Sequence, residues 1–467
     1  MKKLLSLLLA ALLLLSFAAC GDRRTDTGND STADNTSQTD TPSKATSLSI
    51  LSASPELTGA FEEIAAAYRT KTGVTLQLQS QPAETYRNTL LAALDRAEAP
   101  VLFALTSEEE LEQVSDRCAD LQGTALATFL ADKSLALTDK GRLQAIPVDV
   151  TAYGLLYNKA VTDRYFALKD KKTSYASMDE ITDYEKFKAL VHDMAAHKQE
   201  LGINAVFADL PLGNDGDWLS HASSAAVYAD VKDEDSMLMR AVRGLRNFAF
   251  SVGDKVKDAF DLLFDNTVSG RKKLDTVTGA DAMKEFATGK TVFLYTGSDS
   301  YDRLKKVDGS VLKDEDLHFL PLYLGLDGED AMGLTVDTTH YLAINDKASD
   351  AQKQAAVDFL EWLFSAEDGK RFVKEKLGFN APFNTFKEGE LSDDPLKTET
   401  LRHLSKDGET AMPDLSRAYP GGTFRTDVGG SLLQYTRGEK GWDDFVSDVK
   451  TMWNRAVEAG KEMLQVD

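Results

Sequence analysis

Residues 146–159 read IPVDVTAYGLLYNK, and this stretch decides how the rest of the chain is interpreted. Pro147 has no backbone N–H, and the residues that follow it are mostly apolar with little polar interruption. Such a run predicts a largely buried strand, because a strand with one face in water would alternate polar and apolar residues. We expect this strand to leave one folded unit and enter another, which makes it a candidate hinge.

The length and composition of the chain limit the possible classes of protein. A chain of 467 residues is longer than one hydrophobic core usually serves, so we expect two globular units. Hydrophobic residues make up 42% and charged residues 27%, as in an ordinary soluble protein. The net charge of -22 would repel phosphate backbones and anionic lipids, so the composition argues against a nucleic-acid partner.

The N-terminus has the pattern of a processing signal. Lys2 and Lys3 precede an apolar run over residues 4–15, which is short for a membrane span, and small residues then lead to Cys20. This pattern resembles a lipoprotein signal peptide of residues 1–19, with Cys20 as the lipidated first residue of the mature chain. An ordinary secretory peptide that is cut nearby is the alternative.

The next segment, residues 20–46, is rich in Asp, Thr, Ser and Asn and has almost no large apolar residue. Such a composition cannot offset the entropy lost on ordering, so it predicts a disordered tether. Cys118 is the other cysteine of the chain, so no intrachain disulfide is available once Cys20 is acylated.

From residue 47 on, helical and strand patterns alternate. Leu57, Phe61, Ile64 and Tyr68 have helical spacing, and a strand pattern follows them over residues 74–78. Strand, helix and strand in this length predict a βαβ unit with a parallel sheet.

The predicted hinge strand resembles the first crossing between lobes in the extracellular solute-binding proteins of ABC transporters, in particular the family that carries sugars. Four further segments match this family in the same order: residues 61–73, 285–301, 333–345 and 358–372. The resemblance implies an α/β fold of two lobes, the type II periplasmic-binding-protein-like fold, with three crossings between the lobes.

The resemblance also predicts which residues form each lobe. The first lobe would comprise residues 47–149 and 296–336, and the second lobe residues 150–295 and 337–467. The strand at residues 291–295 would be the return crossing.

The sequence does not match the motifs that would indicate catalysis or a cofactor. Residues 288–291 read TGKT like the end of a phosphate loop, but Lys284 stands where the first glycine belongs. His192 and His197 are five residues apart and do not share a helical face, as a zinc pair would. We therefore expect no cofactor, no metal and no enzymatic activity.

Sugars stack their C–H faces on aromatic rings and pair their hydroxyls with polar side chains, so both residue types near the crossings are candidates for ligand binding. Asp217 and Trp218 resemble a family segment whose tryptophan reaches the cleft, although a buried Trp218 is an equal alternative. Tyr86 resembles a residue at the cleft rim. Asp149 and Tyr153 lie on the first crossing itself.

Two departures from the family pattern predict a more polar cleft. Relatives often carry a carboxylate near Thr151, and this chain does not. In a turn that usually carries two tryptophans, Asp299 replaces the first and Tyr301 the second. We therefore expect a smaller sugar or one that carries an amine. Thr339 and His340, on the predicted third crossing, are also candidates, with a structural role as the alternative.

The resemblance implies a monomer that is held outside the cytoplasm by its lipid, closes on a carbohydrate and delivers it to an ABC transporter permease. Two alternatives stay open. The same fold could bind a peptide or polyamine or serve as a ligand sensor. A secreted glycosidase is a further alternative, and it would need two carboxylates that converge on one cleft.

Overall fold

The computed structural model describes residues 47–464 apart from 214–216, 233–237, 388 and 422. The predicted signal peptide, Cys20 and the tether of residues 20–46 lie outside the described residues. Within the described ranges, none of the helices combines the length and the apolar character needed to cross a membrane.

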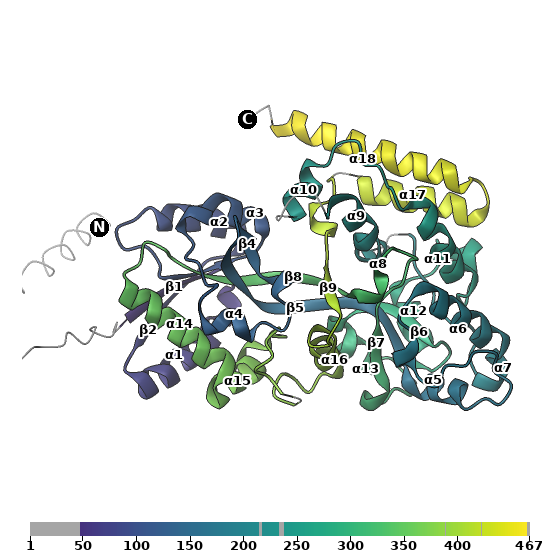
Figure 1. Ribbon diagram of the computed structural model, residues 1–467, viewed down its shortest axis with the longest axis horizontal. Helices are drawn as coiled ribbons and strands as arrows, with labels where there is room; N and C mark the ends of the chain where they lie inside the picture. The colour runs from purple at the N-terminus through teal and green to yellow at the C-terminus, as the bar shows by residue number, and fades with distance from the viewer. Residues whose placement is uncertain (1–46, 214–216, 233–237, 388, 422, 465–467) are drawn as a thin grey trace, which may run out of the picture. The chain divides into compact units, whose positions relative to one another are not determined.

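Two long strands, β5 (Arg142–Asn158) and β8 (Met332–Ile344), form the centre of the fold and pair in antiparallel fashion. They run side by side between two groups of helices (Figure 1). Their register shifts on either side of Asp149, close to Pro147, whose missing N–H cannot serve the ladder. The prediction of a buried strand over residues 146–159 is confirmed.

The first lobe is built on parallel pairs of β1 with β2 and with β3. The antiparallel pair of β3 and β8 joins these strands to the centre of the fold. The elements of this lobe are β1 (Ser47–Ser52), α1 (Thr58–Thr72), β2 (Thr75–Ser80), α2 (Ala83–Leu94), β3 (Leu102–Leu105), α3 (Glu108–Val114), α4 (Ala125–Phe129), β4 (Leu137–Asp139), α14 (Asp350–Ser365) and α15 (Glu367–Phe372).

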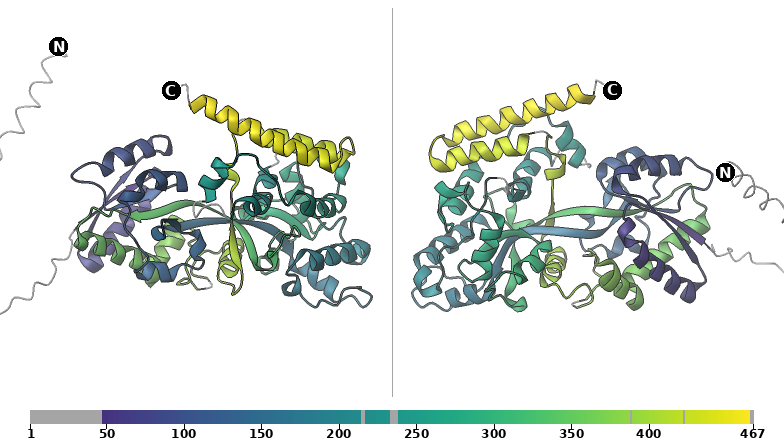
Figure 2. Two further views of the ribbon diagram at one scale, coloured as in Figure 1. Left: turned by 45° about the horizontal axis from the view of Figure 1, so that its top comes forward. Right: turned by 180° about the vertical axis from the view of Figure 1, so that it is seen from behind.

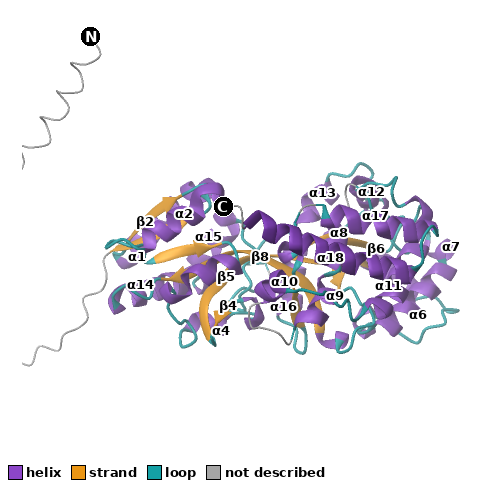
Figure 3. Ribbon diagram, turned by 90° about the horizontal axis from the view of Figure 1, so that it is seen from above, coloured by secondary structure: helices purple, strands orange, loops and turns teal. Residues whose placement is uncertain are grey.

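In the second lobe, β6 and β7 pair with the C-terminal part of β5, and β9 pairs with β8. Figure 3 shows the strands among the helices that surround them. The elements of this lobe are α5 (Lys159–Phe166), α6 (Tyr184–Ala196), α7 (Lys198–Leu201), α8 (Asp217–Ala222), α9 (Ser224–Val231), α10 (Leu238–Gly244), α11 (Gly253–Asp265), α12 (Gly279–Ala287), β6 (Phe293–Gly297), α13 (Tyr301–Lys305), β7 (Leu317–Leu320), α16 (Pro395–Leu404), β9 (Thr410–Pro413), α17 (Phe424–Arg437) and α18 (Trp442–Leu464).

Each lobe has its own hydrophobic core, and β5 contributes to both. Ile146 belongs to the core that contains Leu48, whereas Tyr157 belongs to the core that contains Phe187 and Trp453. The two ends of β5 are buried in different cores and are mostly apolar. Between them, the partly buried residues 149, 151 and 153 alternate with buried ones, as in a strand with one face uncovered.

The structure divides the lobes differently from the sequence-based prediction. Residues 296–336, predicted in the first lobe, include β7, which pairs with the C-terminal part of β5 in the second lobe. Residues 337–467, predicted in the second lobe, include α14, whose Phe359 and Trp362 rings lie 5.1 and 5.0 Å from that of Tyr68 in the first lobe. The reason is that periodicity identifies a strand or helix but not the element against which it packs.

The crossings are corrected in the same way. The strand at residues 291–295 is not a return crossing, because Phe293 belongs to the second core. The return crossing is β8, which ends with Ile344 in the first core. The chain crosses to the second lobe again somewhere in residues 383–396. Phe383 is still in the first core, and Leu396 packs with Leu317 on the second-lobe side of the sheet.

Candidate functional site

Two neighbouring cavities lie where the lobes face each other beside β8. Their volumes are about 330 and about 600 Å³, and both are lined by Thr106, Ser107 and Arg417. The first also has Asp337, Asp414 and Arg243 in its wall, and the second also has Glu56, Glu84 and His340. We call them together the inter-lobe groove. Residues of both lobes and of a crossing strand form it, so a ligand there would contact all three.

Asp337 and Arg417 form an ion pair in the wall of the groove. The Nη2 of Arg417 lies 2.7 Å from the Oδ2 of Asp337, whose side chain is only 11% exposed. Burial raises the pKa of the Asp337 carboxyl above its usual value, and the Arg417 guanidinium opposes this shift. The pair offers a fixed acceptor and a fixed donor to a polar ligand.

Asp337 supplies a carboxylate opposite Thr151, the position on the first crossing where the family resemblance would place a carboxylate. Thr151 on β5 and Asp337 on β8 are directly opposite in the antiparallel register. Opposed residues of an antiparallel pair project on the same face of the sheet, so the carboxylate comes from the neighbouring strand. The sequence analysis missed Asp337 because strand register cannot be read from one sequence.

Asp414 and His221 form a second pair. The Oδ2 of Asp414 lies 2.8 Å from His221 Nδ1, and its Oδ1 accepts hydrogen bonds from the Ser224 hydroxyl and the Ser416 N–H. Burial alone would raise the pKa of the Asp414 carboxyl, but the bond with His221 and the other donors hold it below its usual value. Asp414 is therefore held as an ionised carboxylate.

Tyr153 stacks on His221 beside these carboxylates. The ring centroids are 3.8 Å apart and the rings are tilted by 8°. Burial raises the pKa of Tyr153, and the carboxylates of Asp337, Asp299 and Asp414 raise it further. Tyr153 and Asp299 both lie against Gly297, so these two predicted residues are close together.

Gly297, at the end of β6, permits this arrangement. A Cβ atom at Gly297 would lie 2.6 Å from the Oδ1 of Asp299 and 2.8 Å from the Cε1 of Tyr153, closer than real contacts allow. A residue without a side chain is needed where β6 passes Tyr153.

Asp149 and His340 lie near each other at the hinge. His340 Nδ1 is 3.9 Å from the Oδ2 of Asp149, and the Oδ1 of Asp149 accepts a 2.7 Å hydrogen bond from the N–H of Asn380. Burial raises the pKa of Asp149, although the N–H of Asn380 and His340 oppose the shift. Asp149 thereby ties β5 to the segment that follows α15, whereas His340 lines the groove. Thr339 precedes His340 on β8, and its side chain is not described.

Two predicted ligand residues are buried in the lobes instead. Tyr86 is 1% exposed, and its hydroxyl donates a 2.6 Å hydrogen bond to the carbonyl of Ala104. Trp218 is 9% exposed, and its Nε1 donates a 2.6 Å hydrogen bond to the carbonyl of Pro211. Both support the fold, so the buried alternative holds for Trp218. Asp217 begins α8, and its side chain is not described.

The predicted turn residues Asp299 and Tyr301 have different surroundings. The Asp299 side chain is 54% exposed and lies 3.4 Å from Arg303, near Tyr153. Tyr301 begins α13, and its ring contacts Lys305, whose Nζ is 5.5 Å from the ring centroid. Tyr301 is not part of the groove lining.

The lobes contact each other directly at the groove through α3 and α10. The Glu108 carboxylate accepts hydrogen bonds from the N–H groups of Met239 and Arg240 at 3.3 and 3.0 Å. Glu112 forms a 2.6 Å ion pair with Arg243. Burial raises the pKa of Glu108, although the two N–H groups oppose this shift. These contacts join residues about 130 positions apart and hold the lobes together.

We expect Glu108→Ala to separate the lobes. Loss of two hydrogen bonds to a carboxylate should shift the equilibrium between closed and open forms by about 3 kcal/mol. Small-angle X-ray scattering should then report a larger radius of gyration than for the wild type. Glu109→Ala is the matched control, because Glu109 pairs with Arg87 of the same lobe. Equal radii for the two variants would contradict the assignment of this contact.

The groove has the chemistry of a polar binding site. The Asp337, Asp414 and Arg417 side chains in its wall have fixed partners. Hydroxyl groups of Thr106, Ser107 and Thr338 line the same cavity. Within residues 47–464, as far as they are described, no group of three or more His, Cys, Asp or Glu side chains could hold a metal ion.

Comparisons with known proteins agree with this architecture. A family model described as bacterial extracellular solute-binding protein matches residues 63–398. A solved family 1 extracellular solute-binding protein from Bifidobacterium longum subsp. infantis is 17% identical, with a TM-score of 0.57 over 88% of this chain and 99% of its own. No match is found among curated proteins.

Two other solved structures share the fold. The bacterial solute receptor AcbH, described as having an exclusive preference for β-D-galactopyranose, is 14% identical, with a TM-score of 0.62 over 88% of this chain and 98% of its own. The cyclic α-maltosyl-1,6-maltose binding protein from Arthrobacter globiformis is 15% identical, with a TM-score of 0.55 over 89% and 100%. The family match covers more than half of the chain, and the chain belongs to the bacterial extracellular solute-binding proteins.

Proposed function

We propose that this protein binds a sugar or oligosaccharide in the inter-lobe groove and delivers it to the permease of an ABC transporter. The observation that carries the proposal is the Asp337–Arg417 pair, which joins a crossing strand to the second lobe in the wall of the groove. Carboxylates and guanidinium groups with fixed partners are suited to the hydroxyls of a sugar. The galactopyranose and maltosyl-maltose preferences stated for two proteins of this fold support a carbohydrate.

The proposed mechanism is ligand-driven closure. A sugar in the groove would contact Thr106 and Ser107 of the first lobe and Arg417 of the second. Such a ligand stabilises the closed form by the difference of its affinities for the two forms. The α3–α10 contacts add to the same state. The permease would then recognise the closed protein, and a separate ATPase would supply the energy.

A thermal-shift screen tests the proposed ligand class. A ligand that binds only the folded protein stabilises it by mass action and so raises the melting temperature. At a ligand concentration one hundred times Kd, the free energy of unfolding rises by about 2.7 kcal/mol. We expect a rise with at least one monosaccharide or oligosaccharide. Amino sugars belong in the screen, because Glu56 and Glu84 line the groove. A rise with peptides or polyamines alone would contradict the sugar proposal and favour a carrier of another solute.

Lipid attachment at Cys20 would keep the protein at the outer face of the cell membrane, near its permease. Cys20→Ser is expected to abolish incorporation of an alkyne-labelled fatty acid into the expressed protein, because no acceptor thiol precedes the folded part. Cys118→Ser is the control, since Cys118 is buried and should not take up lipid. Full labelling of the Cys20→Ser variant would rule out this anchor.

A further inference from the structure

A separate cavity of about 330 Å³ lies inside the second lobe and shares no lining residue with the inter-lobe groove. Its walls come from α8, α9, α11, α17 and α18 and from the segment before α11. Helices α17 and α18 lie side by side over one side of this lobe (Figure 2). The cavity lies between this pair of helices and the body of the lobe.

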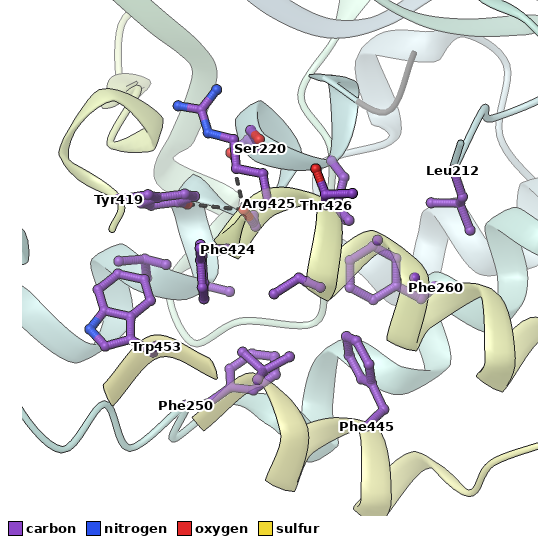
Figure 4. Close-up of a pocket in the computed structure, with 18 of the residues that line it drawn as sticks. Leu212, Ser220, Phe250, Phe260, Tyr419, Phe424, Arg425, Thr426, Phe445 and Trp453 are labelled. Carbon is purple, nitrogen blue, oxygen red and sulfur yellow. Dashed lines mark hydrogen bonds between the residues drawn. The ribbon is translucent and has the colours of Figure 1, made fainter. Parts of the chain in front are cut away.

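Aromatic rings dominate the cavity lining. Figure 4 labels aromatic side chains around the space, among them Phe250, Phe260, Phe424, Phe445 and Trp453. Phe248 also lines the cavity, and most of the other lining residues are leucine, valine, alanine or glycine. Aromatic faces and edges attract apolar rings, so the lining selects for an apolar, ring-containing molecule.

The cavity carries no inward charge to attract an ion. Arg425 is the charged residue in its lining, and its Nη2 donates a 2.7 Å hydrogen bond to the carbonyl of Ser416. Its guanidinium group points away from the rings in Figure 4. One edge is polar but neutral: the hydroxyls of Ser223 and Tyr419 lie 2.9 Å apart. The lining therefore favours a neutral molecule.

The volume of the cavity is sufficient for a molecule with rings. Its lining includes the exposed residues Arg425, Thr426 and Gly430, so a ligand can enter from solvent. An engineered cavity of about 150 Å³ with an apolar lining stays dry and binds benzene. The cavity described here has about 330 Å³ and several aromatic rings in its wall.

We propose that this cavity binds a neutral, apolar molecule containing up to three aromatic rings, independently of the ligand in the groove. One short segment, residues 220–224, lies between the cavity and the groove. Ser220 and Ser223 line the cavity, while His221 and Ser224 bind Asp414 of the groove. A molecule in the cavity would therefore contact the segment that holds a carboxylate of the groove in place.

The test uses the full chain and the neutral dye N-phenyl-1-naphthylamine, whose fluorescence rises in apolar surroundings. Wild-type protein should bind one dye per chain in a saturable way. Leu433→Trp, which adds a ring to the lining, should weaken this binding at least tenfold. Gln434→Trp adds the same ring at the next, exposed position and should leave the affinity unchanged.

Thermal melts show whether each variant is folded. If Leu433→Trp lacks a cooperative transition, Val449→Phe replaces it, since Val449 also lines the cavity. Asp337→Asn in the groove should keep full dye binding. The proposal is overturned if the wild type shows no saturable binding, if the filled variant binds as well as Gln434→Trp, or if Asp337→Asn abolishes binding.

Discussion

Asp337→Asn is expected to weaken the binding of the sugar found in the thermal-shift screen at least tenfold. The change removes a carboxylate acceptor that is 11% exposed and leaves Arg417 without its ion-pair partner in the wall of the groove. A hydrogen bond to a charged group contributes about 1.5–3 kcal/mol, and each 1.4 kcal/mol changes Kd about tenfold. Isothermal titration calorimetry measures the loss directly.

The control for this variant is Asp350→Asn at the start of α14. The Asp350 side chain is fully exposed, and it pairs with Lys353 on the same helix, away from the groove. This variant should bind the sugar like the wild type. If Asp337→Asn kept wild-type affinity while melting normally, the groove would not be the sugar site.

Gly369→Ala is expected to destabilise the first lobe by about 3 kcal/mol, as overpacking of a buried site does. Gly369 lies in α15 where this helix meets the end of α14. A Cβ atom there would lie 2.1 Å from the carbonyl oxygen of Trp362 and 2.7 Å from the Cα of Leu363. Both are backbone atoms, so the helices would have to move apart. Chemical denaturation monitored by circular dichroism measures the change.

Gly59→Ala in α1 is the matched substitution. Apart from the adjacent residues and the backbone of its own helix, no atom lies within 4 Å of the added Cβ, and Gly59 is in an α-helix of the same lobe. Since alanine is favoured over glycine in helices by up to about 1 kcal/mol, this variant should be as stable as the wild type or more so. Similar losses for both variants would mean that the packing of α15 on α14 is not as described.

The fold could be predicted from local sequence because its central strand has an unusual composition. The mostly apolar run after Pro147 predicts a largely buried strand, and β5 is that strand, with Asp149, Thr151 and Tyr153 only partly buried. The assignment of α14 and β7 to lobes failed for a physical reason. Their apolar faces show that they pack on a core, but two cores of similar composition are available, and strand pairing is set by the tertiary structure.

The candidate site could be predicted only in part. Tyr153 and His340 lie on the crossing strands β5 and β8, and Asp299 follows the end of β6. The sequence indicates where these strands are, and the three residues lie at or near the groove. Trp218 and Tyr86 are large aromatic residues that suit a core as well as a sugar, and only their depth in the lobe decides between these roles.

Asp414 and Arg417 lie three residues apart in the chain, but His221, which pairs with Asp414, lies 193 residues before it. None of these three residues could be predicted from a local pattern. Their pairing depends on how α8 and the segment after β9 meet at β5, which no local pattern indicates. The predicted polar character of the cleft stays a prediction, and the paired charges in the groove support it.

The central claim is that the two lobes close on a ligand held between them. Spin labels at Glu62→Cys in the first lobe and Lys232→Cys in the second, both exposed and outside the groove lining, report the separation of the lobes by pulsed electron paramagnetic resonance, and the native Cys118 is buried. Saturation with the sugar that gives the largest thermal shift should move the distance distribution to shorter values. The same sugar concentration should leave it unchanged in the Asp337→Asn background. An unchanged distribution in a sugar-saturated protein would contradict closure.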